Sequence, residues 1–287
     1  MPKWLLPVGR AFYAIGLIGI GVQHFIFANF IPVVVALWPA WMPGRQLPAY
    51  IVGTALIVAG AAILFNFEGR RVAVVAGAAF LLLVVIAHIP GQLMASPWHL
   101  GVWTNAFKAV TLAGGAWIAA RSFEEELPSS DGSSRWMFTA GRFFFAMTLV
   151  VFGIDHFIYT AFVATLVPAW IAGHLFWTYF AGVALIAGGV GMMVRSTTRI
   201  ASLMVGIMIF LWLLMLHIPR AIADPRTGLG NEWTSVFEAL AFSGMAFMLS
   251  VLPLLVRSLR ASEWALRRPL RSRSGTLVER VQGSRRA

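Results

Sequence analysis

The sequence predicts an all-α membrane protein with eight transmembrane helices, arranged as two four-helix bundles in parallel repeat. Of the 287 residues, 59% are apolar and only 11% are charged, whereas soluble proteins usually contain about 25% charged residues. The same rare residues also recur in step in the two halves of the chain, which indicates an internal repeat. The absence of cysteine excludes disulfides, thiol catalysis, cysteine-ligated zinc and cysteine-attached haem.

Each expected helix is an apolar stretch of about 20 residues, the length that crosses the hydrocarbon layer. The first has a positive start but no small-residue cleavage site after it, so we expect it to stay in the protein. In chain order the expected spans are residues 9–31, 47–67, 71–90, 103–120, 138–160, 175–194, 198–218 and 234–256.

Basic residues predict the orientation, because cytoplasmic loops retain lysine and arginine. Only Arg45, Arg220 and Arg226 fall on one side of the predicted spans; Lys108 lies inside the fourth span, and the other basic residues fall on the opposite side. Both termini are therefore expected in the cytoplasm. The tail 257–287 has nine arginines against Glu263 and Glu279, which favours contact with anionic lipid headgroups and not with nucleic acid.

An internal duplication links the two halves. Residues 9–26 align without a gap with 141–158 and match at 9 of 18 positions, and His88-Ile89-Pro90 meets His217-Ile218-Pro219. We expect each proline to end its helix. The expected parts are a first module at 1–120, a polar cytoplasmic linker at 121–140, a second module at 141–256 and a basic cytoplasmic tail at 257–287.

Ionisable residues inside the predicted spans are the candidate site, because charge in a membrane is costly unless it pairs, faces a cavity or binds a ligand. Lys108 and Glu238 align with each other and carry opposite charges, so we expect a cross-module ion pair. The alternative is that Lys108 reaches the interface while Glu238 meets Arg220 or water. The other candidates are His24, His88, Asp155, His156 and His217.

The four histidines allow several interpretations. They could hydrogen-bond backbone carbonyls, or line a pocket for a quinone-like headgroup with Trp41 and Trp170 near its mouth. Haem b could be ligated by His24 with His88 and by His156 with His217, and a non-haem metal is a further alternative. A proton relay between Asp155 and His156 is disfavoured, because adjacent helical residues point about 100° apart.

A first helix ending in His-Phe, an outer Pro-Ala-Trp turn, a third helix with His-Ile-Pro and a fourth led by tryptophan resemble the DoxX-like bacterial membrane proteins. The resemblance covers both halves, although members usually contain one four-helix unit. It implies a multi-pass protein of the bacterial inner membrane, an accessory of respiratory or redox metabolism and a respiratory membrane complex as partner. It implies no catalytic residues, and a small-molecule or proton-coupled transporter remains an alternative.

Overall fold

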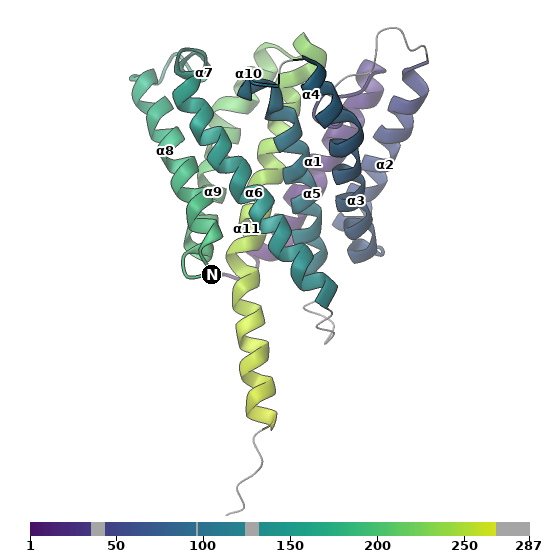
Figure 1. Ribbon diagram of the computed structural model, residues 1–287, viewed down its shortest axis with the longest axis vertical. Coiled ribbons are helices and arrows are strands. Elements are labelled where there is room, and N and C mark those ends of the chain that lie inside the picture. Colours follow the sequence, from purple (N-terminus) through teal and green to yellow (C-terminus); the bar gives the residue numbers. More distant parts are fainter. Residues whose placement is uncertain (36–43, 96, 124–131, 268–287) are drawn as a thin grey trace, which may run out of the picture. The chain divides into compact units, whose positions relative to one another are not determined.

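The computed structural model describes residues 1–35, 44–95, 97–123 and 132–267. Their regular structure is helical, and no β-strand occurs within these ranges. Residues Met1–Leu252 form one compact unit, in which the helices pack side by side, and Pro253–Ala287 form another (Figure 1).

Seven helices in the described ranges are long and apolar enough to cross a membrane. The protein is therefore an all-helical, multi-pass membrane protein. These helices are α1 (Leu5–Phe27), α2 (Gln46–Leu64), the continuous helix Gly69–Met94, α6 (Gly132–Ile158), α8 (His174–Met193), the continuous helix Thr198–Ala223, and α11 (Thr227–Arg267).

The fourth predicted span, residues 103–120, corresponds to α5 (Thr104–Ser122), which is not among these seven. Every residue of α5 from Thr111 to Ala120 is buried. Apart from Thr111 this stretch consists of small and apolar residues, and the charged residues of α5, Lys108 and Arg121, lie outside it. The number of eight spans stays a prediction.

Two membrane helices contain a π-helical turn at the same motif. α3 (Gly69–Leu83) continues through η1 (Val84–His88) into α4 (Ile89–Ala95), and α9 (Thr198–Trp212) continues through η4 (Leu213–His217) into α10 (Ile218–Ala223). The prediction that each His-Ile-Pro ends its helix is therefore wrong. Proline crowds the carbonyl four residues earlier, and the wider turn, in which Ile89 N–H bonds Val84 O, relieves that conflict.

Close glycine contacts bring the first helix of each half against the last helix of the other half. A Cβ added to Gly9 of α1 would lie 2.6 Å from the carbonyl oxygen of Gly244 in α11. One added to Gly114 of α5 would lie 2.7 Å from the carbonyl oxygen of Gly141 in α6. Only glycine permits such backbone contact without a shift of the helices.

Glycines also join the first two helices within each half. Gly21 of α1 faces Gly53 of α2, and Gly153 of α6 faces Gly182 of α8. An added Cβ would meet the partner's carbonyl oxygen at 2.8 Å in the first crossing and at 2.7 Å for Gly153 in the second. These tight crossings hold the helix ends that carry the candidate site residues. Two short elements, η2 (Leu100–Trp103) and α7 (Thr160–Leu166), complete the described helices.

Candidate functional site

His24 and His156 make the same hydrogen bond to their own helix, although they lie in different halves of the chain. The Nδ1 of His24 lies 2.8 Å from the carbonyl oxygen of Ile20, and that of His156 lies 2.7 Å from the carbonyl oxygen of Phe152. A carbonyl can only accept, so Nδ1 carries the hydrogen in both rings. The Nε2 of His24 accepts from the N–H of Ile31 at 3.4 Å. These contacts favour the structural interpretation of His24.

His88 reaches the same chain segment as His24. Its Nε2 lies 3.3 Å from the carbonyl oxygen of Val34, in the turn closed by the bond from Val34 N–H to Ile31 O at 2.9 Å. His24 and His88 are both fully buried. The hydrogen bonds of these two histidines hold the segment that follows α1 in place. The Nδ1 of His88 is buried and has no partner among the described residues.

Haem ligation by His24 and His88 conflicts with these contacts. Both nitrogens of His24 are engaged by the backbone, and an axial ligand needs one nitrogen free for iron. A metal site of another kind is also not assembled in the described part of the chain, where no three His, Asp or Glu side chains lie together.

The predicted ion pair between Lys108 and Glu238 is confirmed. The Nζ of Lys108 on α5 lies 2.7 Å from Oε2 of Glu238 on α11, and the two side chains are 17% and 5% exposed. The other carboxylate oxygen, Oε1, is buried and without a partner in the described ranges. The alternative in which Glu238 meets Arg220 is wrong, because Arg220 binds a different carboxylate.

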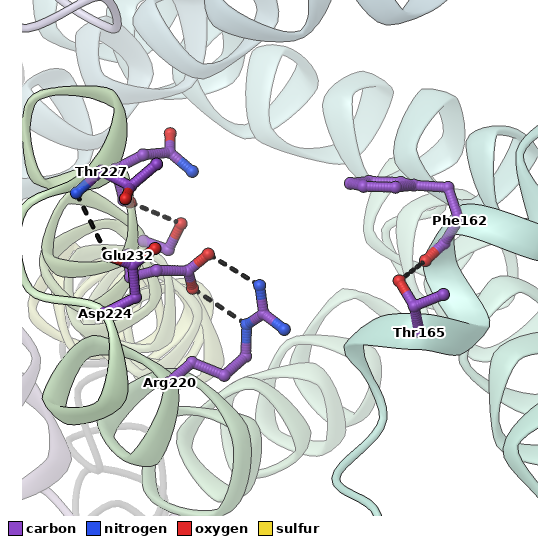
Figure 2. A network of polar contacts seen from close by, with 8 residues as sticks. Phe162, Thr165, Arg220, Asp224, Thr227 and Glu232 are labelled. Carbon is purple, nitrogen blue, oxygen red and sulfur yellow. Dashed lines mark hydrogen bonds and ion pairs between the residues drawn. The ribbon is translucent and has the colours of Figure 1, made fainter.

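Arg220 forms a bidentate ion pair with Glu232. Its Nε donates to Oε2 at 2.9 Å and its Nη2 donates to Oε1 at 2.7 Å, the geometry that makes arginine–carboxylate pairs strong. Figure 2 shows this pair on the same side of the view as Asp224 and Thr227, facing the Phe162 side chain of α7 across the view. Hydrogen bonds from Thr227 lower the pKa of Asp224 below its ordinary value.

His217 lies at the end of η4, in the neighbourhood of Lys108, Glu232 and Arg220. Sequence reasoning had missed Arg220 and Glu232 as site residues, although both are rare charges close to predicted span ends. We name the following five residues the charged cluster: Lys108, His217, Arg220, Glu232 and Glu238.

Asp155 lies near His99, whereas the adjacent His156 bonds its own helix. The His99 ring stacks on Tyr159 with centroids 5.4 Å apart, and the Tyr159 hydroxyl lies 3.3 Å from Nδ1 of His99. Asp155 Oδ1 is buried without a described partner. His99 and Tyr159 were not predicted, because their approach depends on the packing of α6 against η2 and α5.

The aligned residue Gln23 has a structural role. Its Nε2 donates to the carbonyl oxygen of Gly230 at 2.9 Å, and its Oε1 accepts from the hydroxyl of Thr234 at 3.1 Å. The site residues predicted at the mouth are separate from these contacts. Trp170 lies in the turn after α7 with 70% of its surface exposed, and Trp41 lies outside the described residues.

Residues 145–238 match a family model described as a domain of unknown function, DUF8561. The match lies within the predicted second module and includes Asp155, His156, His217, Arg220 and Glu232, and it ends at Glu238. No curated protein matches the chain. No solved structure matches it either.

Proposed function

We propose that the chain consists of two tandem DoxX-like four-helix modules, residues 1–120 and 141–256, with eight spans and both termini in the cytoplasm of a bacterial cell. Equivalent contacts at aligned positions support the duplication. The crossing of Gly9 with Gly244 corresponds to that of Gly141 with Gly114, and the crossing of Gly21 with Gly53 corresponds to that of Gly153 with Gly182. Fusion of protease-sensitive reporters to each terminus tests the orientation.

We further propose that the protein binds a quinone-like or similar small hydrophobic molecule at the charged cluster, as an accessory of respiratory or redox metabolism in the inner membrane. The observation that carries this proposal is the Lys108–Glu238 ion pair between two packed helices, with its Nζ–Oε2 distance of 2.7 Å. Intramembrane charge is expensive, and its presence favours a functional site. His217 and the Arg220–Glu232 pair extend this site.

The chemistry of the cluster suits a neutral, polar headgroup. Two lysine or arginine cations are matched by two glutamates, so the cluster has no large excess of charge to attract an ion. Carbonyl oxygens of a quinone can accept hydrogen bonds from Lys108 or His217, and the unpartnered oxygen of Glu238 can accept one from a hydroxyl. The apolar tail would extend among the exposed aliphatic side chains of the spans.

The test is binding of a short-chain benzoquinone to the purified protein in lipid nanodiscs, followed by tryptophan fluorescence. We expect saturable quenching with the wild type and affinity about tenfold weaker with His217→Ala, which corresponds to the loss of roughly one good hydrogen bond. His156→Ala is the control, because that ring bonds its own helix. Equal affinity for all three proteins would exclude the charged cluster as the site.

A second candidate function is small-molecule or proton-coupled transport. The matched π-helical turns at Val84–His88 and Leu213–His217 favour it, because such turns frequently occur at functional sites. Proton flux into liposomes, measured with a pH-sensitive dye with and without Glu238→Gln, tests this candidate. Flux equal to that of empty liposomes would count against transport.

A further inference from the structure

Three arginines lie close to Thr198 in space or in the chain, away from the charged cluster. Arg142 of α6 donates from Nη1 to the hydroxyl oxygen of Thr198 at 3.4 Å. Arg195 lies close enough to interact repulsively with Arg142, and Arg199 follows Thr198 directly on α9. Like charges gathered in this way destabilise a protein unless an anion lies among them.

Several donors in this cluster are buried and have no partner among the described residues. They are the Nε of Arg142, the Nε of Arg199 and the hydroxyl of Ser202, whose residue is fully buried. Ser202 lies one helical turn after Thr198, on the same face of α9. A buried donor without an acceptor is destabilising, so three of them on the adjacent helices α6 and α9 favour an acceptor-rich ligand.

The described carboxylates all lie elsewhere and cannot neutralise these arginines. Glu68 binds Arg71, Glu232 binds Arg220, Glu238 binds Lys108, Asp224 accepts from Thr227, and Asp155 lies near His99. The cluster therefore has an excess of positive charge within the part of the chain that the structure describes.

In the first half of the chain, the arginine at the aligned position has other neighbours. Arg10 aligns with Arg142, and its guanidinium lies 4.4 Å from the centroid of the Phe123 ring. Gly69, which aligns with Thr198, contacts the same ring, since an added Cβ would lie 2.7 Å from Phe123 Cζ. An aromatic ring lies over the arginine in both halves, since the Arg142 guanidinium is 5.2 Å from the centroid of the Phe143 ring. The second half differs because Arg142 also donates to the hydroxyl oxygen of Thr198, a group that Gly69 lacks.

We propose that Arg142, Arg195 and Arg199, together with Thr198 and Ser202, form a binding site for a phosphate group. Phosphate supplies several acceptor oxygens and negative charge, and the guanidinium group matches it in geometry. The arginines lie at the start of the spans Arg135–Ile158 and Thr198–Ala223, where a membrane protein meets lipid headgroups. The phosphate group comes either from an anionic phospholipid or from a soluble phosphate compound.

The experiment measures lipid binding to the full-length protein in a neutral detergent by isothermal titration calorimetry. The probes are short-chain phosphatidylglycerol, short-chain phosphatidylcholine and inorganic phosphate. We expect phosphatidylglycerol to bind the wild type, and its affinity to fall at least about tenfold with Arg142→Gln and with Arg195→Gln. If Arg142→Gln prevents folding, Arg195→Gln still tests the site. Arg195 is exposed, so its replacement leaves the fold intact.

Arg10→Gln is the matched control, because it removes one positive charge at the aligned position without changing the proposed site. Competition by inorganic phosphate would assign a soluble phosphate compound, and failure to compete would assign the lipid headgroup. Equal loss in Arg10→Gln, or the absence of binding of both phosphatidylglycerol and inorganic phosphate to the wild type, would overturn the proposal.

Discussion

His88 and His217 occupy aligned places at the ends of two π-helical turns, yet their surroundings differ. His88 is fully buried and bonds the backbone of the segment after α1, which His24 also holds. His217 lies among Lys108, Glu232 and Arg220. The aligned positions of Arg220 and Glu232 in the first half are Gly91 and Val102. The same His-Ile-Pro motif therefore contributes to packing in the first half and lies in a charged environment in the second half.

The largest expected effect is the loss of stability when the Lys108–Glu238 ion pair between the two halves is broken. Lys108→Glu and Glu238→Lys alone should each destabilise the protein by about 3–5 kcal/mol, because each leaves a buried charge without its counterion. The double exchange should recover most of this stability. Thermal unfolding in detergent measures it, and a double variant no more stable than the single ones would refute the energetic importance of the pair.

The next prediction tests whether the two glycine crossings between the halves are equivalent. Gly9→Val and Gly141→Val should each destabilise the protein by roughly 1–3 kcal/mol, because a Cβ at either position meets a backbone oxygen of the facing helix. Similar losses of thermal stability would sharpen the comparison. A loss confined to one crossing would show that the halves pack by different means.

An effect of similar size should distinguish His24 from His217. His24→Ala should destabilise the protein by about 1–3 kcal/mol, because the buried N–H of Ile31 loses its acceptor. His217→Ala should change stability less and quinone affinity more. Unfolding midpoints measured beside the fluorescence titration check this, and the reverse pattern would remove the proposed division of roles.

The smallest effect concerns the turn before α11. Since hydrogen bonds from Thr227 lower the pKa of Asp224, the folded turn binds its proton less readily than the unfolded chain does. The stabilisation is present above the ordinary pKa of 3.8 and is lost as the pH falls below it. The protection of the Thr227 amide against hydrogen exchange, relative to its intrinsic rate at each pH, should therefore fall on acidification, and Asp224→Asn should remove that dependence. An unchanged profile in the variant would contradict this.

Much of the fold could be predicted because hydrophobic length and rare residues are local properties. Seven apolar helices occur where spans were expected. Local rules failed at Pro90 and Pro219, where a π turn lets the helix continue. They also gave no reason to distinguish His24 from His217, because the hydrogen-bond partners of a side chain come from other parts of the chain.

By itself the sequence determined the membrane class, the distribution of charge and the candidate polar residues, since these follow from composition and spacing. It also led to the correct pairing of Lys108 with Glu238, because two opposite charges that are costly in a membrane have few partners. Only the tertiary structure decided that Arg220 binds Glu232, that Tyr159 meets His99 and that Arg142 meets Thr198. These contacts join residues 12 to 60 positions apart, and helix packing alone sets which side chains then lie within hydrogen-bonding distance.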